Sequence, residues 1–303
     1  MYDDDMRVVI DTNQLQSNQL RIFLGADSRN MAVLPEHTIL EIFKPSTLEG
    51  VYSAFEVMAD FPDQIIQLRA NRHVADTNVR FPGFANRFIA KEATRGMPRF
   101  IELLNTAREG SIDLQRQLEE RRGWALERID KTISAFGDIA EELAAIRSQF
   151  NPADLAAFSR DERTSHEFKY LLFDLTTRVA DDLSRQRTGR SIPNGQARYN
   201  DFTWRYALCH LLQLVRLVGN GSVRRKPNKV ANDHLDNVFA TFGTYYNGLM
   251  TNDASANATH AVARVILEIL GARVPEDYLG GGYMLKIVDD LYTVEPTGET
   301  IAE

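Results

Sequence analysis

Four acidic residues stand at positions where a chemical site could form, because each follows a short apolar run or opens a helix. Asp11 ends the apolar run Arg7–Ile10, and Asp253 follows the run Leu249–Thr251. Glu41 lies in the helix expected after a second apolar run, and Asp236 in the first turns of a later helix. Clustered carboxylates repel one another unless a cation joins them, and their hard oxygen atoms favour Mg²⁺ or Mn²⁺. The pattern predicts a divalent metal site.

Each acid also has an ordinary structural interpretation when it is taken alone. Asp11 and Asp253 could be helix N-caps, and Asp236 could complement a helix dipole. Glu41 could be a solvated surface residue. The order of the four acids along the chain and their surroundings favour the metal site.

The elements that must position these acids are short strands and helices at both ends of the chain. Apolar runs predict strands over residues 7–10, 31–34 and 248–251 and a late strand over 283–288, each of the first three followed by a helix. Between them, from about residue 52 to 219, the apolar period is helical. The carboxyl ends of parallel strands line one edge of a sheet, where ligands bind. We therefore expect an α/β domain made of residues 1–60 and 222–303, interrupted by an all-helical insertion over 61–221.

The surroundings of the four acids resemble the PIN-domain nucleases. Val8-Val-Ile-Asp11-Thr-Asn13 resembles their opening strand, and Val33 to Glu41 resembles the element that brings a glutamate on a helix. Asn232 to Asp236, followed by Leu249-Met-Thr-Asn-Asp253, resembles their third and fourth acids. The resemblance covers about 60 residues at each end and leaves out the middle, which is larger than the insertions of the family's small members.

The resemblance implies a three-layer fold with a central parallel sheet and metal-dependent hydrolysis of a phosphodiester, usually in RNA. It implies that Asp11, Glu41, Asp236 and Asp253 hold Mg²⁺ or Mn²⁺, with Asp233 and Glu36 as possible substitutes for two of them. Thr12, Asn13 and Thr251 would support these ligands or contact phosphate. No nucleotide-cofactor motif is found. A noncatalytic nucleic-acid-binding protein or a helical scaffold on the same fold remains the alternative.

The charge is unevenly distributed along the 303 residues. The whole chain carries −7, whereas residues 185–229 carry +9. We expect four basic residues just before Asp236 to hold the phosphate backbone of RNA: Arg224, Arg225, Lys226 and Lys229. Aromatic and basic residues also alternate from Phe81 to Phe100, which could clamp a single strand but is better explained as helical core.

A long apolar stripe in the middle of the chain predicts a helix that packs against another helix or a second copy of the chain. Its residues run from Leu126 to Ile146 in steps of three and four. A regulatory protein is the other partner considered. The single cysteine, Cys209, and the neighbouring His210 are interpreted as core residues. No apolar stretch reaches the roughly 18 residues of a membrane helix, so we expect a soluble, cytoplasmic protein without membrane contact.

Overall fold

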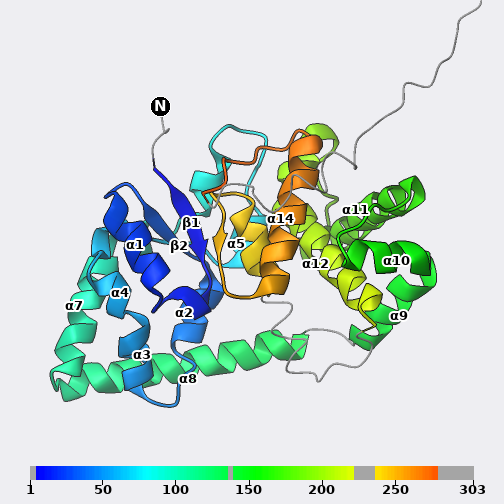
Figure 1. Ribbon diagram of the computed structural model, residues 1–303. Coiled ribbons are helices and arrows are strands. Elements are labelled where there is room, and N and C mark those ends of the chain that lie inside the picture. The colour runs from blue at the N-terminus through cyan, green and yellow to red at the C-terminus, as the bar shows by residue number, and fades with distance from the viewer. Residues whose placement is uncertain (1–4, 136–138, 222–235, 279–303) are drawn as a thin grey trace, which may run out of the picture.

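The strands form one parallel sheet in the computed structural model, which describes residues 5–135, 139–221 and 236–278. The strands are β1 (Arg7–Ile10), β2 (Met31–Leu34), β3 (Ile65–Gln67) and β4 (Leu249–Met250). Their order in the sheet is β3-β2-β1-β4 (Figure 1). Val9 pairs with Val33 on one side and with Leu249 on the other. The two ends of the chain therefore meet in a single sheet, as the sequence predicted.

The expected domain boundaries need correction. β3 lies at residues 65–67, inside the range predicted to be an all-helical insertion, and it pairs with β2 through Ile66 and Val33. Its three residues, which follow Pro62, are too few to show an alternating pattern. The sheet domain therefore extends past residue 60. The predicted strand over 283–288 lies outside the described residues.

Helices cover one face of the sheet with residues from the first half of the chain. Successive strand residues point to opposite faces, and Val8, Ile10 and Leu34 share this core. The helices that line it are α1 (Asn18–Ala26), α2 (Glu36–Ile42), α3 (Leu48–Ala54), α4 (Glu56–Ala59), α7 (Met97–Arg108) and α8 (Ile112–Ala135). The long helix α8 crosses below α2 and α3 (Figure 1).

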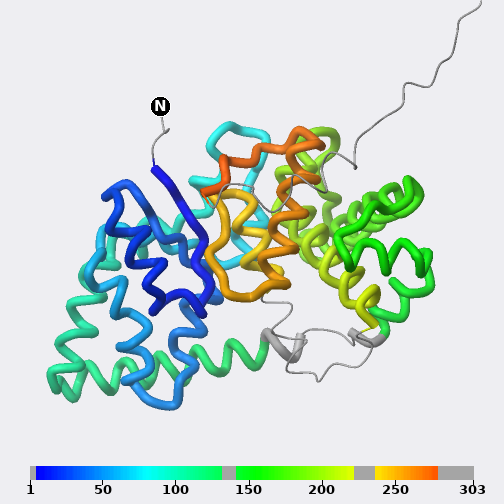
Figure 2. Tube along the Cα trace, in the orientation of Figure 1, coloured from blue at the N-terminus to red at the C-terminus, as the bar shows by residue number. Residues whose placement is uncertain are grey.

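The opposite face packs against the second half of the chain. Val9, Val33 and Leu249 belong to this core. Its helices are α9 (Ile139–Gln149), α10 (Pro152–Ser159), α11 (His166–Thr188), α12 (Phe202–Gly219), the helical residues 236–243 and α14 (Ala254–Ile269). α14 lies between the N-terminal strands and α9 to α12 (Figure 2). Because α12 packs against α14, the predicted insertion completes the core of the sheet domain rather than forming a separate unit.

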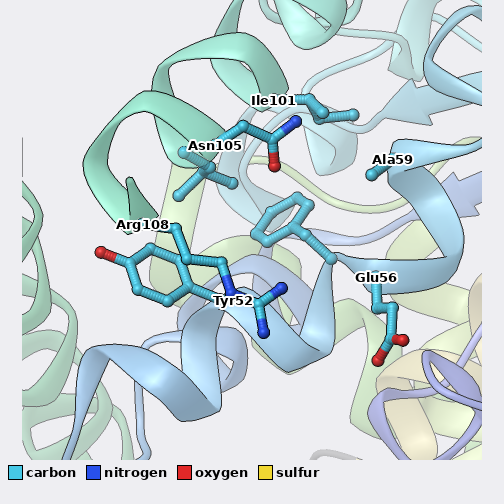
Figure 3. A pocket seen from close by; sticks show the side chains of 8 residues that line it. Tyr52, Glu56, Ala59, Ile101, Asn105 and Arg108 are labelled. Atoms are coloured by element: carbon cyan, nitrogen blue, oxygen red, sulfur yellow. The ribbon is translucent and has the colours of Figure 1, made fainter. Parts of the chain in front are cut away.

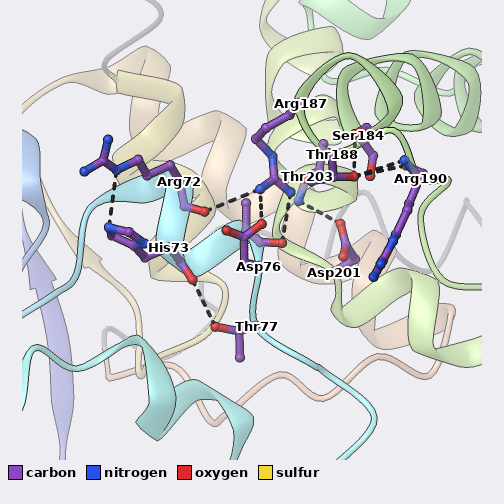
Figure 4. Close-up of polar contacts among 11 residues, drawn as sticks. Arg72, His73, Asp76, Thr77, Ser184, Arg187, Thr188, Arg190, Asp201 and Thr203 are labelled. Atoms are coloured by element: carbon purple, nitrogen blue, oxygen red, sulfur yellow. Dashed lines mark hydrogen bonds and ion pairs between the residues drawn. The ribbon is translucent and has the colours of Figure 1, made fainter.

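Short elements connect these layers. They are the helices α5 (Asn71–Ala75) and α6 (Lys91–Arg95) and the 3₁₀ turns η1 (Thr12–Gln14), η2 (Pro62–Gln64), η3 (Phe84–Phe88) and η4 (Gly195–Asn200). Arg187, near the end of α11, ties α5 to this region: its guanidinium pairs with Asp76 and donates to the carbonyl oxygens of Arg72 and Ala75 (Figure 4).

The predicted apolar stripe divides between the two cores. Ile129 of α8 is buried beneath α2, whereas Leu143 and Ile146 of α9 are buried beside α12. Residues 136–138, between the two helices, lie outside the described residues. Ile129, Leu143 and Ile146 are thus buried within the chain itself, and Leu126 is partly buried.

Two interpretations of core residues are confirmed. Cys209 is fully buried, and burial raises the pKa of its thiol to about 12. His210 is also buried, where its Nε2 lies 3.0 Å from Oε2 of Glu142. Among the described helices, none combines the length and apolar character needed to cross a bilayer.

Candidate active site at the carboxyl edge of the sheet

The strand order creates a natural binding position beside β1. From β1 the chain moves outward to β2 and β3, and β4 then returns on the other side of β1. In open parallel sheets, ligands bind outside the carboxyl ends of the strands at such a reversal. Asp11 follows β1 and Thr251 follows β4 at this position.

Asp11 is held at the centre of this position by side chains from both strands. Its carboxylate Oδ2 accepts hydrogen bonds from Oγ1 of Thr251 at 2.6 Å and from Nδ2 of Asn13 at 2.5 Å. Asp11 is 5% exposed. It precedes η1 but makes no side-chain capping bond there, so the N-cap interpretation does not explain it.

Glu41 reaches the same position from α2. Its Oε2 accepts a hydrogen bond from Oγ1 of Thr12 at 2.5 Å. Oγ1 of Thr38, on the same helix, donates to the carbonyl oxygen of Ile10 at 3.2 Å and fixes α2 against the end of β1. Thr38 was not singled out from the sequence, because no motif marks a threonine that anchors a helix.

Asp253 caps helix α14 and is also linked to Asp11 through Thr251. Its Oδ1 accepts the backbone N–H of Ala256 at 2.8 Å, so it caps α14 as the simpler interpretation proposed. Its own N–H donates to Oγ1 of Thr251, which in turn donates to Asp11. The backbone N–H of Asn252 donates to Oδ1 of Asn13, which joins the two loops. This last contact links residues 239 positions apart and has no local sequence signal.

Burial dominates the electrostatics of Asp11 and Glu41. Burial raises the pKa of Asp11, hydrogen bonds from Thr251 and the backbone oppose the rise, and the negative charge of Asp253 adds to it. Burial likewise raises the pKa of Glu41, the hydrogen bond from Thr12 and the positive charge of Lys44 oppose the rise, and the negative charge of Asp11 adds to it. Charge on either carboxylate is therefore disfavoured mainly by burial, with a smaller contribution from an acidic neighbour.

Asp236 is the first described residue of the helical segment 236–243, which ends shortly before β4 begins. This segment packs in the core that α12 and α14 share, and the place of Asp236 at the acidic edge stays a prediction. Asp233, its possible substitute, lies outside the described residues.

Glu36 is not placed with the other acids. It lies five residues before Glu41 on α2, and positions with this spacing lie on different sides of a helix. The Glu36 carboxylate pairs with Arg128 of α8 and accepts the backbone N–H of Asn71 at 3.4 Å. Between the two glutamates, the geometry therefore favours Glu41.

The carboxylates offer suitable donors for a divalent ion, but not a finished coordination shell. Over residues 5–135, 139–221 and 236–278, no three His, Cys, Asp or Glu side chains are arranged so that they could hold one ion. The hydrogen bonds from Thr12, Asn13 and Thr251 occupy one oxygen each of Asp11 and Glu41. Binding an ion would require these side chains to rotate.

Within residues 185–229, several of the described arginines form ion pairs or are buried within the protein. Arg187 pairs with Asp76, Arg216 pairs with Asp161, and Arg205 is fully buried. The residues expected to contact phosphate lie outside the described residues: Arg224, Arg225, Lys226 and Lys229. The described arginines thus support the fold rather than a continuous basic face.

The aromatic–basic stretch is divided between core and surface. Phe84 and Phe88 are buried and contact each other, which confirms the core interpretation for them, whereas Phe81 is 52% exposed beneath the guanidinium of Arg87. A small pocket between α3 and α7, lined by Tyr52, Asn105 and others, holds none of the acids predicted for the site (Figure 3). The acidic edge therefore remains the candidate site.

Comparisons with family models, with curated proteins and with solved structures found no match for this chain.

Proposed function

We propose that this protein is a metal-dependent endonuclease that hydrolyses phosphodiester bonds, with RNA as its substrate. The observation that supports the proposal is the position of Asp11 at the reversal of strand order, where Thr251 donates a hydrogen bond to it and Thr12, the next residue, donates one to Glu41. Burial raises the pKa of Asp11 and of Glu41, which indicates an energetic cost of charge that a bound cation would reduce.

Mg²⁺ or Mn²⁺ fits the chemistry of the donors, because carboxylate oxygens are the ligands that these ions prefer. Asp11, Glu41, Asp236 and Asp253 would hold it, and a bound divalent ion lowers the pKa of a coordinated water and stabilises charge on a phosphoryl group. Thr12 and Thr251 would orient the carboxylates by the hydrogen bonds that they already donate. Asn13 would keep the β1 and β4 loops together.

RNA as the substrate rests on the resemblance to the PIN-domain nucleases and on charge. The four basic residues before Asp236 would bring positive charge to an acidic edge that otherwise repels a polyanion. Their contribution would be independent of base sequence.

A noncatalytic nucleic-acid-binding protein or scaffold is the second candidate. It is favoured by the hydrogen bonds that satisfy Asp11 and Glu41 without an ion and by the lack of a three-ligand arrangement among the described residues. Binding of RNA without cleavage in Mg²⁺ or Mn²⁺ would support it.

The test is cleavage of a mixed RNA pool with Mn²⁺, with Mg²⁺ and with a chelator. We expect cleavage only with the ions, and Asp11→Asn should reduce it by at least about 100-fold, since even residues behind metal ligands contribute 10–100-fold. Asp201→Asn is the matched control, because Asp201 is similarly buried but caps α12. It should cleave normally. Undiminished cleavage by Asp11→Asn would reject the site.

A further inference from the structure

A second pocket lies along the same edge of the sheet, on the other side of α2. It is formed where β3 ends, between α2 and α8, and its cavity is about 140 Å³. Leu40 of α2, Phe43 just after α2 and Leu68 after β3 form its apolar wall. Roughly 150 Å³ is enough for a benzene-sized ring in an apolar cavity. The pocket is therefore of the size of one flat aromatic ring.

One face of α8 presents an indole between two guanidinium groups at this pocket. Arg121, Trp124 and Arg128 are spaced by three and four residues, which places them on one side of the helix. Trp124 is 54% exposed although it lines the pocket. The guanidinium of Arg128 lies 5.4 Å from the centre of its ring. An exposed indole at a concave site is an available surface for stacking.

Arg121 is fixed in place beneath the pocket by aromatic rings. Its guanidinium lies 5.6 Å from the ring centre of Phe43 and 5.0 Å from that of Phe100. Burial lowers its pKa, which shows that the charge is partly removed from water. A planar guanidinium held in this way stacks on flat π systems.

The rim of the pocket carries a group that can pair with the edge of a base. Gln67 lines the pocket, and a side-chain amide both donates and accepts hydrogen bonds. Glu36 also lines it, but its carboxylate already pairs with Arg128 and accepts the backbone N–H of Asn71. An aliphatic ligand would make no use of the indole.

We propose that this pocket binds an unpaired nucleobase of single-stranded RNA, stacked against Trp124 and Arg121, while the backbone of the strand continues to the acidic edge. This inference rests on the proposed function. α2 links the two positions, because it gives Ile39 and Leu40 to the pocket and Glu41 to the acidic site. The pocket would select single strands, since a paired base cannot enter it.

The experiment measures binding in a chelator, so that hydrolysis plays no part. The protein has two tryptophans, and Trp204 is fully buried, so quenching by acrylamide reports mainly on Trp124. Uridine 5′-monophosphate, whose base is a single ring, should change the Trp124 emission saturably and protect it from acrylamide, and ribose 5-phosphate should not. Trp124→Phe should remove the accessible component of the signal.

Affinity for a single-stranded RNA decamer provides the second measurement. Trp124→Ala should weaken binding about 5- to 150-fold, the loss expected for one stacked base. Tyr170→Ala is the matched control, because Tyr170 is an exposed aromatic residue on α11, outside the pocket, and should bind normally.

The outcomes separate the pocket from the proposed activity. Unchanged RNA affinity of Trp124→Ala, or equal effects of uridine monophosphate and ribose phosphate, would overturn the base pocket even if the protein cleaves RNA. Base binding without Mn²⁺-dependent cleavage would keep the pocket and reject the nuclease.

Discussion

Asp11 and Asp201 are both buried, and each lies directly before a helical element, η1 for Asp11 and α12 for Asp201. Burial raises the pKa of both. Their surroundings differ in the sign of the nearest charge. Asp201 accepts the backbone N–H groups of Thr203 and Trp204, and the positive charge of Arg187 opposes the rise in its pKa. Asp11 accepts mainly side-chain donors and is opposed by another carboxylate, Asp253.

The comparison shows that burial and a raised pKa do not by themselves mark a functional carboxylate. At the start of α12, two backbone N–H groups and the positive charge of Arg187 oppose the effect of burial, and the pKa of Asp201 is raised all the same. At the carboxyl edge of the sheet, the negative charge of Asp253 adds to the rise in the pKa of Asp11. An acidic neighbour in place of a cation is therefore the feature by which Asp11 differs from Asp201.

The largest effect that separates the two aspartates is stabilisation by a divalent ion. Mn²⁺ at 100 times its dissociation constant should raise the free energy of unfolding by about 2.7 kcal/mol. Asp11→Asn should lose this increase and Asp201→Asn should retain it, as measured by thermal melts with and without Mn²⁺. An equal Mn²⁺ effect in both variants would break the comparison.

The pH dependence without metal should not separate them. A raised carboxyl pKa in the folded state makes stability fall as pH increases from the unfolded value of 3.8 through the folded pKa. Replacing either carboxyl group removes its contribution to this decrease in stability with rising pH. The stability of Asp11→Asn and of Asp201→Asn, each relative to the unmodified protein, should therefore rise between acidic and neutral pH in denaturant titrations. A flat profile for Asp11→Asn alone would show that its charge is compensated.

Replacing the cap itself should affect stability without affecting cleavage. Asp201→Ala removes the acceptor for two backbone N–H groups and should lower the free energy of unfolding by about 0.5–2 kcal/mol. Asp201→Asn, which can still cap, should be close to the unmodified protein in this respect. A loss of RNA cleavage at full stability would mean that Asp201 contributes to the site.

The smallest expected effect concerns the cation beside Asp201. Arg187→Gln breaks an ion pair with Asp76 in which both side chains are partly exposed, and should cost about 0.2–1 kcal/mol. Its affinity for RNA should be unchanged, because the charge of Arg187 is already engaged by Asp76. A shallower salt dependence of RNA binding in this variant would instead place Arg187 against phosphate.

The sequence allowed the local parts of this molecule to be predicted. β1 and β2 have the bounds expected from their apolar runs, because a short buried strand is marked by its own residues. Asp253 was correctly placed at the end of a strand and the start of a helix.

The long-range parts could not be read from the sequence. β3 is a strand because β2 pairs with it, and its own residues carry little signal. The hydrogen bond between Thr251 and Asp11 joins residues 240 positions apart, and the aromatic pocket collects residues from α2, β3 and α8. Such contacts depend on how the cores pack, which no local pattern specifies.

The pairing of β1 with β4 also sets when the acidic site can exist during synthesis. β1 leaves the ribosome first, but its partner Leu249 is made some 240 residues later, at about 5–20 residues per second. For at least about ten seconds, a nascent chain carries Asp11 without Thr251 or Asp253. The contacts between Asp11 and the loop after β4 can therefore form only once residue 253 has been synthesised.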